Sequence, residues 1–108
     1  MRIYEPARST SVETIRRYGE LASRDGSAEV AAQQWTQAGF DDAMTARWLQ
    51  ARCFDPQAAS GLSELGVTPE QSAARTRDGG GYIDTIAYKV ANGDLTVRQG
   101  AARTLSSR

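Results

Sequence analysis

The stretch AGFDDAMTARWLQARCFDPQAASGLSELGVTPEQ, residues 38–71, decides the fold because it contains one short pattern three times. In each copy an apolar residue precedes Asp or Thr, and a residue suited to the first turn of a helix follows. The side-chain oxygens of Asp and Thr accept hydrogen bonds from the free N–H groups at a helix start, and proline suits the first helical position. The copies are Phe40-Asp41-Asp42, Phe54-Asp55-Pro56 and Val67-Thr68-Pro69, and a fourth lies at Leu95-Thr96-Val97. The pattern predicts helices that begin every 13 or 14 residues.

Other signals mark the beginnings and ends of the same helices. Capping boxes, in which two side chains bond the backbone at a helix start, are predicted at Thr10-x-x-Glu13, Thr68-x-x-Gln71 and Thr96-x-x-Gln99. Glycine is expected directly after a helix because it adopts the left-handed conformation there. The glycines that fit this position are Gly26, Gly39, Gly66 and Gly93. The predicted helices span about residues 11–24, 28–38, 42–52, 56–65, 69–78, 82–91 and 97–106.

These signals predict an all-α fold, a compact bundle of six or seven short helices in units of about 14 residues. No segment alternates apolar and polar residues over a useful length, so we expect no strand. Trp35 and Trp48 are expected to anchor the core. We expect residues 1–9 to be extended or frayed and residues 10–108 to form a single helical domain.

The composition is that of a globular domain in a reducing compartment. Of the 108 residues, 40% are apolar and 24% are charged, which is near the globular average. Cys53 is the only cysteine, which excludes an intramolecular disulfide, and we expect it to be a small buried thiol. No run approaches the ~20 apolar residues of a membrane helix, and the N-terminus lacks the apolar segment of a signal peptide. We therefore expect a cytoplasmic protein without membrane contact.

The residue types exclude most catalytic chemistry. The chain has no histidine, which removes the usual general base near neutral pH and the commonest metal ligand. Gly79-Gly80-Gly81 lacks a Lys, Ser or Thr at the spacing of a phosphate loop, so we interpret it as a hinge. Asp41 and Asp42 are neighbours on a predicted helix and point about 100° apart, so we interpret them as capping residues. We expect no enzymatic activity, no cofactor and no metal.

The net charge is zero, but the charge is unevenly distributed. Residues 38–71 carry five acidic and two basic side chains, whereas residues 72–108 carry six basic and three acidic ones. The simplest interpretation is ordinary solvated surface, and the alternative is two surfaces for two macromolecular contacts. The acidic candidates for protein binding are Asp41, Asp42, Asp55, Glu64 and Glu70. The basic candidates for binding a nucleic acid or another partner are Arg75, Arg77, Lys89, Arg98 and Arg103.

One interpretation of the basic end is a small helix–turn–helix DNA-binding regulator. The last two predicted helices flank residues 92–94, and the second carries Arg98, Gln99 and Arg103, residue types that read guanine and adenine edges. The basic end would add phosphate contacts. The turn fits the motif poorly, because Lys89 and Asp94 stand where a small and an apolar residue are expected. Zero net charge also disfavours a dedicated DNA-binding protein.

The other interpretation is a protein that binds proteins. The segments WTQAGFDDAMTARW (35–48), CFDPQAA (53–59) and GVTPEQSAARTRDGGGYIDTIAYKVANGDLTVRQ (66–99) resemble small helical proteins of phages and plasmids of high-GC bacteria, of the anti-CRISPR type. The resemblance implies a stoichiometric inhibitor that docks on a host protein or nucleoprotein complex by surface complementarity, without a cofactor. The acidic candidates would then oppose a surface that normally binds nucleic acid. We expect this interaction protein, with the DNA-binding regulator as the alternative.

Overall fold

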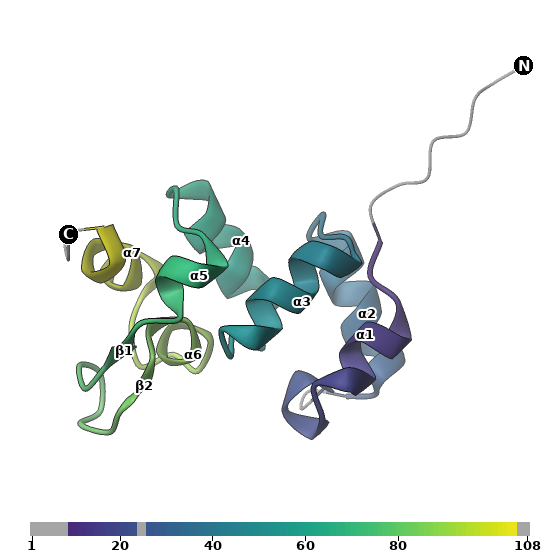
Figure 1. Ribbon diagram of the computed structural model, residues 1–108, viewed down its shortest axis with the longest axis horizontal. Coiled ribbons are helices and arrows are strands. Elements are labelled where there is room, and N and C mark those ends of the chain that lie inside the picture. Colours follow the sequence, from purple (N-terminus) through teal and green to yellow (C-terminus); the bar gives the residue numbers. More distant parts are fainter. Residues whose placement is uncertain (1–8, 24–25, 106–108) are drawn as a thin grey trace, which may run out of the picture. The chain divides into compact units, whose positions relative to one another are not determined.

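The computed structural model describes residues 9–23 and 26–105, and in these residues the fold is built mainly from short helices (Figure 1). The α-helices are α1 (Val12–Arg17), α2 (Ala28–Gln37), α3 (Asp42–Gln50), α4 (Pro56–Glu64), α5 (Pro69–Ser72), α6 (Ile86–Ala91) and α7 (Val97–Leu105). A 3-10 helix, η1 (Glu20–Ser23), follows α1, and the strands β1 (Arg75–Thr76) and β2 (Asp84–Thr85) separate α5 from α6. The predicted all-α class is confirmed, apart from this small hairpin. Among the described residues, no helix is long and apolar enough to cross a bilayer.

The chain forms two compact units, residues 1–46 and 47–108, and the boundary falls within α3. The first unit contains α1, η1 and α2, and the second contains the hairpin and α4 to α7. A single domain over residues 10–108 stays a prediction. Most of the segment predicted to be extended or frayed, residues 1–8, lies outside the described residues.

The repeated helix starts are confirmed in atomic detail. Asp41 accepts a hydrogen bond from the Met44 N–H at 2.9 Å, and Asp55 accepts one from the Gln57 N–H at 3.0 Å. The capping boxes at Thr68 and Thr96 are complete, since each Thr hydroxyl and its Gln partner three residues later bond the backbone reciprocally. The glycines that end the preceding helices have the left-handed conformation, and they are Gly39, Gly66 and Gly93.

The first helix differs from the prediction at both ends. Its cap is Ser11, whose hydroxyl accepts a hydrogen bond from the Thr14 N–H. Thr10 instead lies buried and bonds the Phe40 carbonyl at 2.9 Å and the Thr45 hydroxyl at 2.7 Å. The helix ends at Arg17 rather than near residue 24, because Gly19 adopts φ +83° and breaks the α-helical ladder.

The second difference lies around the three glycines, where the prediction of no strand is wrong. The helix predicted over 69–78 ends at Ser72, and the one predicted over 82–91 begins at Ile86. Between them β1 and β2 pair antiparallel. Gly79, Gly80 and Gly81 have φ of +80°, +97° and +82°, a conformation open mainly to glycine, so they reverse the chain in a hairpin. The predicted hinge is therefore an ordered hairpin loop.

The two tryptophans and the cysteine occupy the interior, as predicted. Trp35, Trp48 and Cys53 are each 0% exposed. In the first unit Trp35 packs edge-on against Phe40, with ring centroids 5.3 Å apart. This contact joins α2 to the residue that precedes the Asp41 cap.

Helices of the second unit approach closely at two glycines. A Cβ added at Gly61 of α4 would lie 3.1 Å from the Val97 side chain of α7. A Cβ added at Gly100 of α7 would lie only 2.4 Å from Cγ2 of Val90 on α6. Since valine is stiff at its first side-chain torsion, α6 and α7 could not keep this spacing with a larger residue at position 100.

We predict that Gly100→Ala destabilises the protein by about 1–3 kcal/mol, the usual effect of overpacking a core. At an open helix position the same change would stabilise by up to ~1 kcal/mol, so the sign of the change is diagnostic. Urea unfolding measures it. The double variant with Val90→Ala should show that the two substitutions are not additive. A stabilised Gly100→Ala variant would contradict the close packing of α6 against α7.

Candidate binding surface at the glycine hairpin

The loop between β1 and β2, residues 77–83, reverses the chain at three consecutive glycines. All three glycines in it are left-handed. At Gly79 space is restricted as well, because an added Cβ would lie 3.0 Å from the Asp94 carbonyl oxygen and 3.1 Å from the Leu95 side chain. The loop therefore packs closely against the turn between α6 and α7.

The buried side chain of Lys89 on α6 holds this loop in place. This side chain is 0% exposed, and its Nζ donates hydrogen bonds to the carbonyl oxygens of Asp78 at 2.8 Å and Gly79 at 2.9 Å. A third hydrogen bond goes to the carbonyl oxygen of Tyr82. Since an ammonium group has three donors, each one has an acceptor within the loop. Lys89 was predicted to contribute to a basic surface, and the structure corrects this, because its charge is buried.

Tyr82 adds two more contacts to the same anchor. The Lys89 Nζ lies 3.8 Å from the centre of the Tyr82 ring, within the range of a cation–π interaction. The Tyr82 hydroxyl donates a hydrogen bond to the Asp94 carboxylate, which Asn92 also reaches at 3.2 Å. These bonds, that from Tyr82 first, lower the pKa of Asp94 below its usual value. The same contact raises the pKa of Tyr82, so at neutral pH the pair stays a phenol and a carboxylate.

At the other end of the hairpin, Arg52 binds Asp84 of β2. The guanidinium Nε and NH2 atoms lie 2.9 and 3.0 Å from the two carboxylate oxygens, a bidentate geometry. Partial burial raises the pKa of Asp84, but the bonds from Arg52 and the Thr85 N–H outweigh it, so the pKa is lowered. Arg52 has φ +68° and is the only described non-glycine residue with positive φ. Such strain is retained where surrounding contacts compensate for it.

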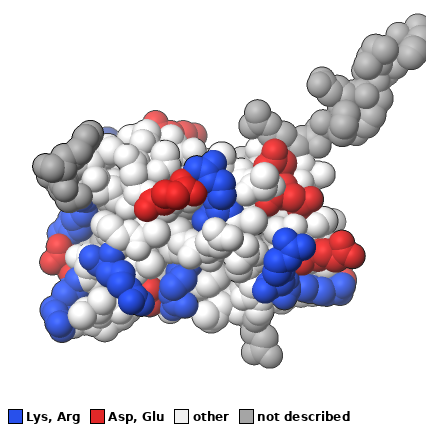
Figure 2. Space-filling view, viewed as in Figure 1, with Lys and Arg blue, Asp and Glu red and all other residues white. Residues whose placement is uncertain are grey.

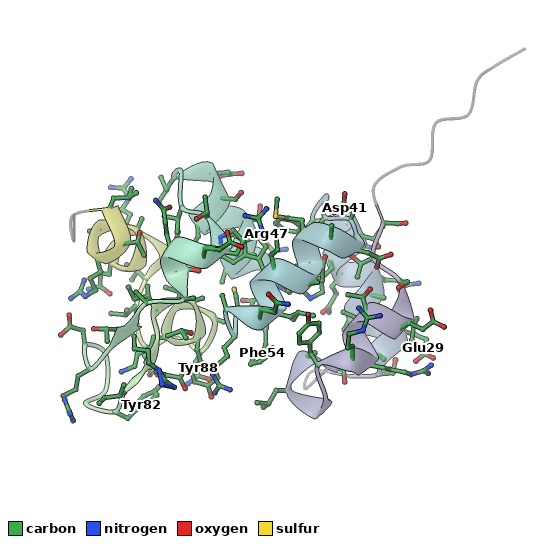
Figure 3. The ribbon with its side chains drawn as sticks, viewed as in Figure 1. Glu29, Asp41, Arg47, Phe54, Tyr82 and Tyr88 are labelled. Atoms are coloured by element: carbon green, nitrogen blue, oxygen red, sulfur yellow. The ribbon has the colours of Figure 1, made fainter. Side chains whose placement is uncertain are left out.

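A row of three aromatic rings connects these two anchors. Phe54 and Tyr88 meet edge to face with centroids 6.3 Å apart, and Tyr88 and Tyr82 do so at 6.5 Å. The rings come from the chain before α4, from α6 and from the hairpin loop, and Figure 3 shows them as neighbours. The Arg52 guanidinium carbon lies 4.8 Å from the Tyr88 ring centre. The hairpin is thus held in place by Lys89 at its loop, by Arg52 at β2 and by the aromatic rings between these two residues.

Five side chains of this hairpin are exposed. Asp78 is paired with Arg103, and we call the other four the hairpin surface: Arg75, Arg77, Tyr82 and Ile83. Ile83 is 51% exposed, the largest fraction among the large apolar side chains described, and Tyr82 is 38% exposed. Figure 2 shows basic side chains over the hairpin with acidic ones among them. The hairpin surface therefore combines guanidinium, aromatic and aliphatic groups on backbone that is held in place.

Four of the five predicted acidic residues have structural contacts. Asp41 and Asp55 cap helices, as described above, and Glu70 forms a salt bridge with Arg47 that holds the pKa of Glu70 at about 2. Asp42 accepts hydrogen bonds from the Ser11 N–H at 2.6 Å and the Thr14 hydroxyl at 2.7 Å. Glu64 is exposed at the end of α4. Two of the five belong to the first unit and three to the second.

The residues predicted to read DNA are also largely occupied. Arg103 forms a salt bridge with Asp78 at 2.8 Å and donates to the Gln99 carbonyl at 3.1 Å. The Gln99 side chain completes the capping box at Thr96. Arg98 remains exposed on α7. Of the three base-reading candidates, the structure leaves Arg98 alone without an internal role among the described residues.

A groove lies in the first unit, and its chemistry differs from that of the hairpin surface. It is an open groove of about 520 Å³. Its lining residues are Thr10, Ser11, Val12, Glu29, Ala32, Gln33, Thr36 and Gln37. Glu29 is the one carboxylate in this lining, and it pairs with Arg16 at 3.0 Å. Within residues 9–23 and 26–105, no three acidic or cysteine side chains come together as metal ligands would.

Comparison of the chain with protein-family models, curated proteins and solved structures finds no match.

Sequence reasoning missed Tyr82, Ile83 and Arg52. The first two were assigned to a helix start, although three consecutive glycines before them are a signal for a loop. For Arg52 the signal was indirect, because the second copy of the pattern, at Phe54, has no glycine before it where the others have one. The structure shows that Arg52 itself takes the left-handed position there.

We predict that Lys89→Met loosens the hairpin loop. Methionine keeps much of the side-chain volume but removes the three donors, and hydrogen bonds from a charged group contribute about 1.5–3 kcal/mol each. The free energy of unfolding should fall by roughly 3 kcal/mol or more, and amide hydrogen exchange should accelerate in residues 78–83. Arg98→Met, on the exposed face of α7, is the matched control. Unchanged exchange in the loop would contradict the anchoring role.

We predict that Asp42 contributes to stability at neutral pH and loses this contribution in acid. The hydrogen bond from the Ser11 backbone, with that from Thr14, lowers the pKa of Asp42 below its usual value. The stabilisation is complete above the unfolded pKa of about 3.9 and is lost as the pH falls below it. Thermal melts at pH 7 and pH 3 should therefore differ less in Asp42→Asn than in the unaltered protein. An equal difference would contradict this contribution.

Proposed function

We propose that this chain is a non-enzymatic interaction protein of the cytoplasm that docks on another protein through the hairpin surface. The observation that carries the proposal is the anchored loop. A buried ammonium group fixes the backbone of a glycine loop whose Tyr82 and Ile83 side chains face solvent. Rigid loops on a stable scaffold are the usual carriers of binding residues.

Energetic reasoning supports this assignment. Binding is weakened by the entropy lost when a loop becomes ordered, and a loop already held in its final conformation avoids that loss. Tyr and Arg are the residue types enriched among the side chains that dominate binding energies, and the hairpin surface contains both. The other large exposed apolar side chains, which are 37–43% exposed, are not combined with such an anchor.

The resemblance to anti-CRISPR proteins gives the proposal its concrete form. We propose a stoichiometric inhibitor, encoded by a phage or mobile element, that blocks a host nucleic-acid-handling complex without a cofactor. We propose a docking site away from the acidic candidates, because four of these five residues already have internal contacts. They cap helices, bond the residues at the start of α1 or form a salt bridge. The hairpin surface is a better candidate than an acidic mimic of nucleic acid.

The DNA-binding regulator is the competing assignment. The exposed Arg98 on α7 favours it. The internal bonds of Gln99 and Arg103 and the burial of Lys89 count against it, since a recognition helix needs several side chains free to reach base edges.

Site-specific photo-crosslinking in the host cell tests the proposal. A benzophenone amino acid at position 83 should give one defined protein adduct, whereas the same group at the exposed position of Leu65, just after α4, should not. One equivalent of the unaltered protein should then abolish nucleic-acid binding or cleavage by the purified adduct partner, and Ile83→Asp should weaken this inhibition at least tenfold.

Two results would overturn the assignment. One is an adduct pattern that is the same at positions 83 and 65. The other is tight binding of a DNA duplex that weakens steeply with salt and is lost in Arg98→Ala, which would establish the regulator instead.

A further inference from the structure

We infer that the partner presents an acidic surface, with at least two carboxylates beside an apolar pocket that receives Ile83. This inference rests on the proposed docking function and adds the chemistry of the partner. It follows from two observations: which charged side chains of the second unit already have an internal partner, and which side chains of the hairpin are exposed.

Every acidic side chain between residues 72 and 105 has an internal partner. Asp78 pairs with Arg103, Asp84 pairs with Arg52, and Asp94 accepts hydrogen bonds from Tyr82 and Asn92. None of these carboxylates pairs with Arg75 or Arg77, which form no salt bridge within the described part of the chain. Arg77 donates one long hydrogen bond of 3.4 Å to the Gly81 carbonyl. Arg75 acts on Asp84 only at longer range, as the last of the causes that lower the pKa of this carboxyl. The hairpin therefore carries two exposed guanidinium groups that form no salt bridge among the described residues.

The strand pairing places these two groups near Ile83. Arg75 pairs with Thr85 and Thr76 pairs with Asp84, and Arg77 and Ile83 are the first loop residues beyond this last pair. Residues two apart on an extended chain lie about 7 Å apart. Arg75, Arg77 and Ile83 are exposed, whereas Thr76 and Asp84 are half-buried and Thr85 is buried, so the exposed groups of the hairpin gather next to its last strand pair.

The same surface fits nucleic acid poorly. An isoleucine side chain has no flat face for stacking on a base, which is the main sequence-independent contact to single strands. The Tyr82 ring already has the Lys89 ammonium at 3.8 Å, and its hydroxyl is bonded to Asp94. Two arginines also supply few phosphate contacts, whereas proteins that depend on this attraction make about 6–10 of them.

An acidic protein surface with an apolar pocket fits both the two arginines and the isoleucine of the hairpin surface. Arginine binds carboxylates through two parallel N–H···O bonds, and carboxylates one helical turn apart lie about 5–6 Å from each other, close to the spacing of the two arginines. An apolar pocket next to them would remove Ile83 from water, and full burial of such a side chain is worth about 1.5–3 kcal/mol.

Selection from a display library tests the inference with a defined probe. Random 15-residue peptides are selected on the immobilised full chain and on four variants, and binding is measured by titration. Ile83→Ser and Arg77→Glu alter the hairpin surface, while Leu65→Ser and Arg98→Glu make the same changes at exposed positions elsewhere. Selected peptides should contain paired Asp or Glu beside a large apolar residue. Their binding should weaken at least tenfold in the first two variants and stay within twofold in the controls.

The charge reversal provides the sharpest readout. Selection on the Arg77→Glu variant should enrich basic peptides in place of acidic ones. Peptides that depend on Ile83 but carry no acidic bias would overturn the acidic partner and leave the docking function intact. Binding of a 25-nucleotide poly-dT probe that is lost in Arg77→Glu, with no peptide that depends on Ile83, would overturn both. Failure to enrich any peptide dependent on Ile83 would also overturn the inference.

Discussion

The hairpin of the second unit depends on one buried ammonium group. Lys89 satisfies its three donors with backbone carbonyls of a single loop and covers the ring of a tyrosine from the same loop. A buried charge is tolerated only when such acceptors surround it, so the loop and the lysine require each other. This mutual requirement explains why three adjacent left-handed glycines form a defined surface rather than a hinge.

Much of the helical framework could be predicted because its determinants are local. The caps at Asp41, Asp55, Thr68 and Thr96 act on backbone two or three residues away, and the structure places each where the sequence indicates. The errors occurred where distant contacts override local signals. Thr10 forms hydrogen bonds across 26 to 35 residues, and these set where α1 begins more strongly than its own capping pattern does.

The candidate surface was harder to predict than the fold, for the same physical reason. Charge along the sequence suggested two patches, but charge alone does not reveal which groups neutralise one another. The pair of Arg52 and Asp84 joins residues 32 apart, and the burial of Lys89 depends on a hairpin that the helix pattern concealed. Arg75 and Arg77 are exposed, as the sequence predicted. Their apolar neighbour Ile83 could be recognised only once the strand pairing was known.

The division between local caps and distant pairs also has a consequence for the order of folding. Caps that act over two or three residues need little loop closure, and the bonds from Lys89 to the loop span only 7 to 11 residues. Pairing Arg52 with Asp84, 32 residues apart, requires the chain to close a long loop first. We therefore expect the capped helices to form before the hairpin surface is complete. A nascent chain would then expose helical segments while its binding residues are still unassembled, so the ability to bind a partner would arise only at the last step of folding.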